Sequence, residues 1–358
     1  MLDGKKNRYG RTAARQHRTL GRARRPATTT IDIHCHIVVA AGAQVAGPHV
    51  DPTKVPLAYF ANSATKEINA LQEKDRAKVM VDVDSRLFDM DAMGIDIQVV
   101  APAPPQCYYS VNAEIGERAH RAINEGVAEF VSRRPDRFVG LGVTTMQAPD
   151  LAVSELETAV TKLGLKGVQI LTSVNGGELS DPKYGPFFAK AEELKAFIML
   201  HPNGFTEGRR FTDYYFNNVV GNPLETTLAL HQLIFSGTLA RFPELKILAV
   251  HGGGYLPAYS GRIDHAWGAR DDSHADLSLP PSTYLRQVYF DTVVFTEHQL
   301  AYLLDVFGPD RILLGTDYPF DMGEYDPIGH VGALDLDDRT FSAVCGGNAA
   351  LALGLSRA

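Results

Sequence analysis

Short apolar runs alternate with longer segments of helical periodicity along most of this 358-residue chain. Eight runs rich in Val, Ile, Leu and Phe have the length of buried strands, namely residues 31–37, 95–101, 138–144, 167–171, 197–201, 247–251, 288–291 and 312–317. Between them, apolar residues recur at i, i+3, i+4 and i+7, which predicts helices over 113–133, 150–163, 184–194, 224–241 and 297–307. Strands that alternate with helices form parallel sheets, so eight strands with interleaved helices predict an α/β fold of the (β/α)8 TIM barrel type.

Two connections in this pattern are too long for a simple strand–helix unit. The first spans residues 38–93, and we interpret about 48–87 within it as an insertion that covers the barrel mouth. The second, residues 205–221, concentrates arginine and aromatic side chains that suit a pocket wall or a subunit contact. We therefore expect one domain over residues 30–358, a barrel with an insertion at about 38–93, preceded by an N-terminal tail over residues 1–29.

Charge separates this tail from the rest of the chain. Residues 1–26 contain nine Lys or Arg and one acidic residue, whereas the whole chain has a formal net charge of −7. A basic segment with few large apolar residues predicts a tail that is mobile or docked on another subunit. Nucleic-acid binding is disfavoured because the charges lack regular aromatic interleaving, and export is disfavoured because no apolar segment follows Arg24 and Arg25.

Composition narrows the class of protein further. A hydrophobic content of 45% allows a large core, and the lack of any run of about 18 apolar residues argues against a membrane-spanning helix. The cysteines Cys35, Cys107 and Cys345 are odd in number and irregularly spaced, so no disulfide framework is expected. A reducing compartment, and thus the cytoplasm, is the favoured location.

Four of the predicted strands carry residues at or near their ends that can bind a metal ion. His34 and His36 form an H-x-H pair in the first strand, and the alternation of side chains on a strand points both imidazoles to the same side. Three further strands end, in order, on His201, His251 and Asp317. Because the carboxyl ends of parallel strands meet at one rim of a barrel, we expect these five side chains to converge.

The expected cluster has the composition of a metal site with an adjacent acid/base. His34, His36, His201 and Asp317 offer three imidazole nitrogens and one carboxylate, which suits a single zinc ion with an open position; manganese and iron are alternatives. His251 need not bind the metal and could transfer a proton, a role that Asp317 could share. A second ion is disfavoured because no bridging anion is evident on the middle strands, and the remaining candidates are expected to be surface or core residues, namely His265, His274, His298 and His330.

Five motifs of the chain can be compared with known families: His34-Cys35-His36, His201-Pro202, His251-Gly252-Gly253-Gly254, the segment 261–267 and the segment 315–324. Together they resemble the amidohydrolase superfamily, and in particular its branch of aminocarboxymuconate semialdehyde decarboxylases. The resemblance implies the distorted barrel of metal-dependent hydrolases and a zinc-dependent, oxygen-independent decarboxylase of an aromatic-derived or unsaturated acid. It implies that His34, His36, His201 and Asp317 are the metal ligands and that His251 is the acid/base.

The same resemblance implies roles around a small-molecule carboxylate substrate. Phe320 matches an aromatic residue that packs on the substrate, and Arg262 matches an arginine that reaches the substrate carboxylate of a neighbouring subunit, which implies a homodimer or higher oligomer. Two positions depart from the family pattern. Asn203 replaces the tryptophan that usually follows His-Pro, and Arg76 is, with Lys74, only an approximate counterpart of the arginine expected in the first insertion. The pocket is therefore expected to have diverged, and the sequence does not identify the substrate.

Three other functions use the same residues and remain open from the sequence. A hydrolase or hydratase would direct a metal-bound hydroxide at a carbonyl or an activated double bond. A metal-dependent hydroxylase would use a redox metal and oxygen. A non-catalytic subunit would keep the barrel and a structural metal while it assembles with a related chain.

Overall fold

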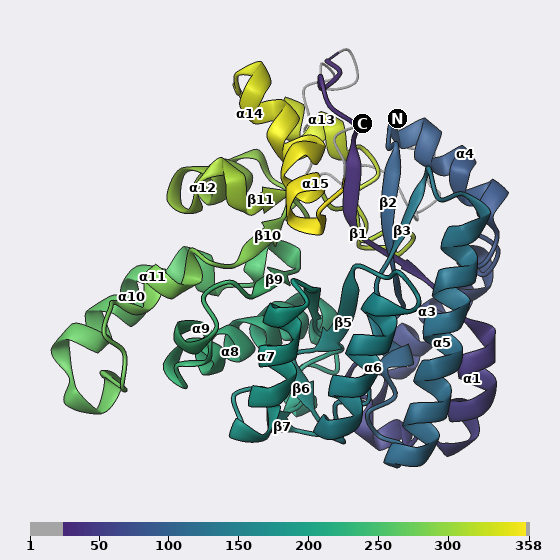
Figure 1. Ribbon diagram of the computed structural model, residues 1–358, viewed down its shortest axis with the longest axis horizontal. Coiled ribbons are helices and arrows are strands. Elements are labelled where there is room, and N and C mark those ends of the chain that lie inside the picture. Colours follow the sequence, from purple (N-terminus) through teal and green to yellow (C-terminus); the bar gives the residue numbers. More distant parts are fainter. Residues whose placement is uncertain (1–23, 356–358) are drawn as a thin grey trace.

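The computed structural model describes residues 24–355 (Figure 1). Most of the predicted basic tail therefore lies outside the described residues. Its described end, residues 24–29, runs along the C-terminal helices. There Arg24 donates a hydrogen bond to the carbonyl oxygen of Leu336 at 2.6 Å and pairs with Asp338 at 2.7 Å.

Parallel strands form two sheets at the centre of the molecule. One sheet has the order β1-β2-β3, with β1 at Ile31–Ile37, β2 at Ile97–Pro102 and β3 at Phe138–Gly140. The other has the order β11-β10-β9-β8-β5-β4, in which β4 is Gly142–Val143, β5 Gly167–Leu171, β8 Phe197–His201, β9 Lys246–Ala249, β10 Tyr289–Asp291 and β11 Ile312–Leu313. A short antiparallel hairpin pairs β6 (Ser173–Val174) with β7 (Gly177–Glu178). All strand pairs within the two larger sheets are parallel, which confirms the predicted α/β class.

Backbone hydrogen bonds link elements of the two sheets at both edges. Near the junction of β3 and β4, the N–H of Leu141 donates to the carbonyl oxygen of Val100 at 2.9 Å. At the other edge, the N–H of Asp317 donates to the carbonyl oxygen of His34 at 2.7 Å. The first strand therefore lies directly beside the segment that follows the last strand.

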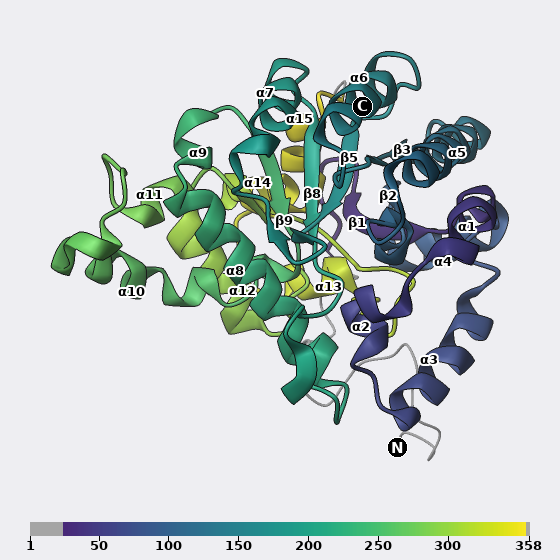
Figure 2. The ribbon, with the colours of Figure 1, turned by 90° about the horizontal axis from the view of Figure 1, so that it is seen from below.

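Helices pack around the strands (Figures 1 and 2). Four of them, α1 to α4, lie between β1 and β2, where one long connection was expected. No helix in residues 24–355 is long and apolar enough to traverse a bilayer. The helix bounds are α1 Ala40–Ala46, α2 Pro56–Tyr59, α3 Ser63–Arg76, α4 Val83–Met93, α5 Ala113–Arg133, α6 Pro149–Thr161, α7 Gly185–Glu193, α8 Asn222–Phe235, α9 Thr238–Arg241, α10 Leu256–Ala269, α11 Pro281–Leu285, α12 Glu297–Phe307, α13 Pro327–Gly332, α14 Asp338–Ser342 and α15 Asn348–Leu353.

Local sequence explains where several helices begin and end. Helix α4 begins after Asp82, whose carboxylate accepts a hydrogen bond from the N–H of Ser85, and it ends at Gly94, which has a φ of 76°. The helix predicted over 224–241 is divided into α8 and α9 because Gly237 adopts a φ of 73° between them. The predicted helices over 113–133 and 297–307 match α5 and α12.

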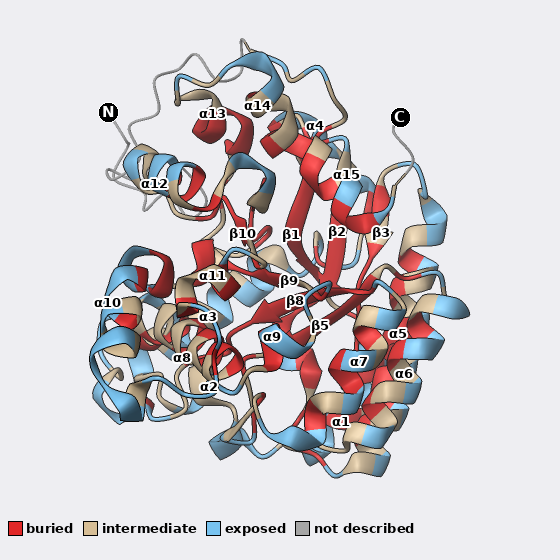
Figure 3. Ribbon diagram, turned by 60° about the vertical axis from the view of Figure 1, so that its left-hand side comes forward, coloured by how far each residue is buried: buried red, intermediate tan, exposed pale blue. Residues whose placement is uncertain are grey.

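The core has two layers. One cluster gathers apolar residues of several strands, including Ile33, Val99, Phe197 and Leu248, with helix α15 packed against it. The other lies where the helices cover the strands (Figure 3). Burial of this apolar surface fixes the strand positions, and with them the polar residues at the strand ends.

Candidate metal centre and active site

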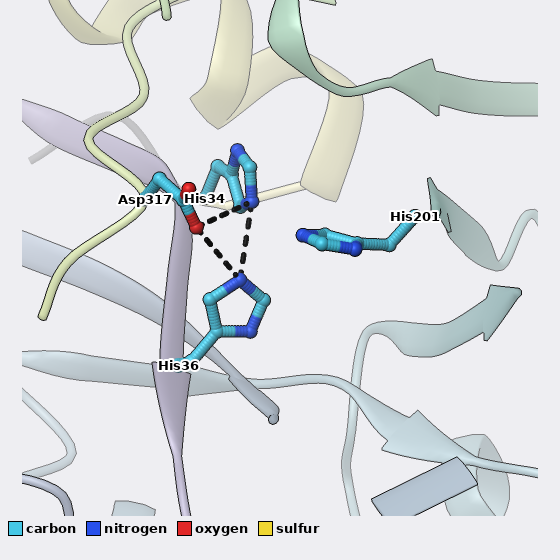
Figure 4. Close-up of side chains that lie close together, drawn as sticks. All are labelled: His34, His36, His201 and Asp317. Atoms are coloured by element: carbon cyan, nitrogen blue, oxygen red, sulfur yellow. Dashed lines mark hydrogen bonds and ion pairs between the residues drawn. The ribbon is translucent and has the colours of Figure 1, made fainter. Parts of the chain in front are cut away.

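Strand β1 brings two imidazoles together, as the alternation of its side chains predicts. The Nε2 atoms of His34 and His36 lie 3.1 Å apart, and both side chains are fully buried. His201, at the end of β8, points toward them from across the site, and Asp317 lies beside them (Figure 4). The ligand atoms of these four residues all lie within 4.8 Å of one another.

The carboxylate of Asp317 divides its two oxygens between different neighbours. Oδ1 lies 3.2 Å from His36 Nε2 and 3.4 Å from His34 Nε2, whereas Oδ2 lies 3.5 Å from His251 Nε2. Burial alone would raise the pKa of Asp317, but the neighbouring His34, His251 and His36 outweigh it and hold that pKa well below its ordinary value. Asp317 is therefore an anion within a group of imidazoles.

The hydrogen bonds around the rings fit the group to a cation. His34 Nδ1 lies 2.7 Å from Asp291 Oδ2, and His201 Nδ1 lies 2.6 Å from the carbonyl oxygen of Pro202. Protons on these Nδ1 atoms leave the Nε2 lone pairs to face the centre of the group. His201 Nε2 has no hydrogen-bond partner among the described residues. Three imidazole nitrogens and one carboxylate oxygen around a common point indicate a divalent metal site.

Burial keeps two of the imidazoles neutral. It lowers the pKa of His36 to about 4 and that of His201 well below its ordinary value. A metal ion binds the neutral ring, so these shifts favour metal binding at neutral pH.

Asp291, at the end of β10, holds the site together, and its role was missed from the sequence. In addition to its contact with His34 Nδ1, it accepts backbone N–H bonds from His251 at 3.0 Å, from Gly252 at 2.9 Å and from Val293 at 3.1 Å. Burial would raise the pKa of Asp291, but the contact with His34 outweighs it and the pKa is lowered. A signal for this role was present, because the predicted strand 288–291 also ends on an acidic residue.

A second network, of buried hydrogen bonds, supports β1. Asp32 accepts hydrogen bonds from Thr316 Oγ1 at 2.6 Å and from Gln98 Nε2 at 2.9 Å. Gln98 Oε1 accepts from Arg86 at 3.1 Å, and Arg86 also donates to the carbonyl oxygen of His36. Sequence reasoning did not identify Asp32, Gln98, Thr316 or Arg86 as part of the site. Arg86, for example, lies on α4 and reaches β1 only in the folded chain.

His251 stands beside the metal group and follows β9. Its ring centroid lies 5.2 Å from that of His34 and 5.2 Å from that of His201, and its side chain is 17% exposed. The backbone is left-handed here, with φ values of 56° at His251 and 58° at Asp317. Strands β9 and β11 therefore end before these residues, earlier than the predicted strands 247–251 and 312–317.

Three glycines, Gly252, Gly253 and Gly254, follow His251. A Cβ on Gly252 would lie 2.3 Å from the Val294 side chain, and one on Gly254 would lie 2.2 Å from the carbonyl oxygen of Pro223. The glycines are needed for close packing within the protein.

A cavity of about 270 Å³ opens onto the metal group, and His201, His251 and Asp317 line it. Phe320, Asn203 and Arg76 line it as well, and the Arg76 guanidinium lies 4.8 Å from the centre of the Phe320 ring. Tyr215 and Asp321 also reach this cavity. Neither was singled out as a site residue, although 205–221 was expected to form a pocket wall.

The other candidates lie outside this cavity in the described chain. Arg262 is exposed on α10, which extends away from the strands (Figures 1 and 2). It does not line the cavity of its own chain. The four histidines that were set aside are not part of the metal group: His265, His274 and His298 are exposed, and His330 is buried in α13.

Comparison with known proteins adds a family to this geometry. Residues 31–355 match the family model described as amidohydrolase. The chain is 35% identical to 2-amino-3-carboxymuconate-6-semialdehyde decarboxylase of Dictyostelium discoideum, over 78% of this chain and 82% of that protein. It is 29% identical to gamma-resorcylate decarboxylase of Rhodococcus jostii strain RHA1, over 69% of this chain and 80% of that protein.

A solved structure agrees with these relatives. The crystal structure of 5-carboxyvanillate decarboxylase LigW from Sphingomonas paucimobilis superposes with a TM-score of 0.81 and 26% sequence identity. The match covers 92% of this chain and all of that one. The chain therefore belongs to the amidohydrolase family.

Proposed function

We propose that this protein is a metal-dependent, non-oxidative decarboxylase of an aromatic or unsaturated carboxylic acid, and thus a carbon–carbon lyase. The observation that carries this proposal is the group of His34, His36, His201 and Asp317 at the end of a cavity that also holds His251. The three relatives reported above, which match most of the chain, are decarboxylases by name.

We assign a single zinc ion to His34, His36, His201 and Asp317, because three nitrogens and one oxygen match its preferred ligands. A divalent ion held there would polarise a substrate oxygen and offset the negative charge that develops as carbon dioxide leaves. Asp291 keeps the proton of His34 on Nδ1, so that Nε2 stays available as a ligand.

His251, with Asp317 beside it, supplies the proton that the reaction needs. When the bond between the ring or alkene carbon and the carboxylate breaks, carbon dioxide leaves and that carbon must gain one proton. His251 lines the cavity, and its Nε2 lies 3.5 Å from Asp317 Oδ2. His251 therefore delivers the proton, while Asp317 Oδ1 remains directed at the metal group.

Three residues of the cavity wall hold the substrate. Arg76 provides a positive charge that can bind a carboxylate with two hydrogen bonds. Phe320, under the Arg76 guanidinium and 5.0 Å from the His36 ring, provides an apolar face for a planar substrate. Asn203 provides a side-chain amide next to His201.

Arg262 acts in the site of a second subunit in this proposal. Its exposure on the projecting helix α10 leaves it free to reach another copy of the chain, and its own cavity does not use it. The assembly would be a homodimer or a higher oligomer. If this chain instead assembled with a related chain, Arg262 would be exposed in the same way, but the arginine that enters this chain's cavity would come from the related chain.

The closure of the barrel, the insertion over its mouth and the cellular location are also part of this proposal. We infer that the two sheets are one distorted (β/α)8 barrel, which the hydrogen bond between Asp317 and His34 helps to close. Residues 38–93 are an insertion over the mouth, since Leu57, Gln72 and Arg76 line the cavity. A cytoplasmic location fits the three buried, unpaired cysteines.

Carbon dioxide release tests the function. Zinc-loaded protein is incubated with the acids on which the relatives act by name, 2-amino-3-carboxymuconate-6-semialdehyde, gamma-resorcylate and 5-carboxyvanillate. We expect carbon dioxide from at least one acid, without oxygen uptake, and loss of the activity on chelation. The His251→Asn variant should keep the metal and lose at least about 100-fold in kcat.

Other products would contradict the proposal. Consumption of an acid without carbon dioxide would indicate a hydrolase or hydratase. Oxygen uptake with iron in the purified protein would indicate a hydroxylase. Purification with a related chain and without activity alone would indicate a subunit of a hetero-oligomer.

A further inference from the structure

A second cavity of about 250 Å³ lies next to the catalytic cavity. The two share part of their lining, namely Val55, Pro104, Pro105 and Asn203. Both open among the loops that follow the strands, since Leu171 at the end of β5 also lines the second cavity. The shared residues form a partition between the place of the reaction and a neighbouring space of similar size.

Asn203 is the polar member of this partition. It is only 8% exposed, and its Oδ1 has no hydrogen-bond partner among the described residues. Its main chain is fixed, because its carbonyl oxygen accepts a hydrogen bond from the N–H of Leu57 at 3.1 Å. A buried amide oxygen without a partner is unfavourable, so a ligand group that donates a hydrogen bond there would be stabilised.

The chemistry of the second cavity is polar and nearly neutral. Its lining carries one basic residue, Lys54, and one acidic residue, Glu207. Most of its other polar groups are hydroxyls and amides, which include those of Tyr108, Ser110, Thr172, Ser173, Asn175 and Thr206. Such a lining suits hydroxyl groups, which both donate and accept hydrogen bonds, better than it suits an apolar chain or a second carboxylate.

We propose that the second cavity binds a hydroxyl-bearing arm of the substrate, which passes Asn203 while the carboxylate is held at the metal group. The inference rests on the proposed function and deepens it, since it names the substrates as planar acids with a neutral, hydroxylated substituent. Asn203 is then a specificity-determining residue, and its amide bonds the arm where it crosses the partition.

Ligand binding tests this without turnover. Zinc-loaded protein carrying His251→Asn is titrated by calorimetry with 2-hydroxybenzoate and with its derivatives that bear a 2,3-dihydroxypropoxy or a butoxy arm at ring carbon 4 or 5. We expect one dihydroxypropoxy acid to bind about tenfold more tightly than both the parent acid and its butoxy analogue, as one or two hydrogen bonds would give.

Two variants locate the arm. Ser110 lines the second cavity and not the catalytic one, so Ser110→Tyr fills only the former and should remove the tenfold preference. Asn203→Leu keeps the side-chain size and should reduce the preference by removing the amide. Glu114→Tyr, at an exposed position early in α5, is the matched control and should keep the preference in full. Ser173→Tyr, at another position in the lining of the second cavity, repeats the first test in case Ser110→Tyr does not fold.

The outcomes are separable from those of the proposed function. Equal affinity for the dihydroxypropoxy and butoxy acids would overturn the inference, as would a preference that both tyrosine variants in the cavity retain. The tyrosine variants could abolish the preference in a protein that releases no carbon dioxide from any acid. That combination would support binding of the arm in the second cavity and would contradict the decarboxylase function.

Discussion

Two buried histidines of this protein occupy opposite kinds of site. His120, on the inner face of α5, uses both ring nitrogens: Nδ1 lies 2.8 Å from Thr145 Oγ1, and Nε2 lies 2.8 Å from the carbonyl oxygen of Cys107. His201 uses one, since Nδ1 faces the carbonyl oxygen of Pro202 and Nε2 has no hydrogen-bond partner among the described residues. Burial lowers the pKa of both rings, to about 4 for His120.

The difference teaches how to separate a structural histidine from a metal ligand. The two rings are similar in burial and in the direction of the pKa shift, so neither property identifies the ligand. The partners do, because a ring whose nitrogens are both hydrogen-bonded must lose a bond to accept a metal ion. His201 also shares its space with other imidazoles and a carboxylate, whereas the carboxylate near His120 is Glu155, reached through Thr145.

Replacing each of the two histidines with alanine should give the largest contrast, in metal content and in the free energy of unfolding. His201→Ala should remove the metal and the activity, and it should lower the free energy of unfolding of the metal-free protein less than His120→Ala does, because His201 already lines a cavity and has a single hydrogen-bonded partner. His120→Ala should keep the metal but lower the free energy of unfolding by about 3 kcal/mol, because it leaves a buried cavity and two unpaired groups. Metal analysis and urea unfolding after chelation measure the two effects. The same loss of metal in both variants would remove the distinction.

Asp291→Asn probes what fixes the ligand geometry. The amide keeps a single acceptor oxygen, which can take the place either of Oδ1 toward the N–H groups of Gly252 and Val293 or of Oδ2 toward His251 N–H and His34. It also no longer favours the proton on His34 Nδ1 as an anion does. We expect zinc affinity to fall by about 10- to 100-fold, as for other carboxylates behind a ligand histidine. Competition with a chromogenic chelator measures it. Asp305→Asn, on the exposed face of α12, is the control, and equal affinities in the two variants would count against this role for Asp291.

Arg76→Met tests a residue of the cavity wall that lies on α3 and not at a strand end. Loss of a charged partner of the substrate carboxylate should raise KM by about 10- to 100-fold while kcat changes less. Lys74→Met removes the same charge from an exposed position of the same helix and should leave both constants unchanged. If Lys74→Met has the larger effect on KM, the assignment of Arg76 is wrong.

The smallest expected effect is the pH dependence of the free energy of unfolding at Glu155, whose carboxylate bonds Thr145 beside His120. Burial raises the pKa of Glu155 to about 7 from an ordinary value of 4.5, so the folded state holds a proton that the unfolded state releases. The stability that Glu155 contributes is full below about pH 4.5 and is lost as the pH rises through about 7. His120 acts in the opposite direction, because its lowered pKa costs stability as the pH falls below 6.5 toward 4.

Glu155→Gln isolates the first of these contributions. The free energy of unfolding of the variant, relative to the unsubstituted protein, should rise by about 1–3 kcal/mol between pH 4.5 and 7.5, after a discount for the partial exposure of the side chain. Unfolding in urea over this pH range measures the difference. A constant difference would show that Glu155 does not change its protonation state on folding.

The sequence predicted the site best where strand geometry alone decides it. Alternation along 31–37 places His34 and His36 together, and the parallel order of the strands brings His201 and Asp317 to the same end. The ends of β9 and β11 were misjudged, because the left-handed turns at His251 and Asp317 depend on bonds to residues far away in the chain. Periodicity carries no information about such bonds.

Contacts between distant segments could not be predicted for the same reason. Arg86 donates to the carbonyl oxygen of His36 across 50 residues, and Asp291 contacts His34 across 257 residues. The second cavity could not be predicted either, since its lining combines residues from several distant segments around Asn203. Only the folded chain sets these distances.

The metal content of purified protein tests the central claim most directly. Elemental analysis of the unsubstituted protein, of His201→Ala and of His120→Ala, all expressed with added zinc, compares the two histidines in one measurement. We predict about one zinc ion per chain in the first and the third, and near none in His201→Ala. Full zinc content in His201→Ala, or no divalent metal in the unsubstituted protein, would contradict the account.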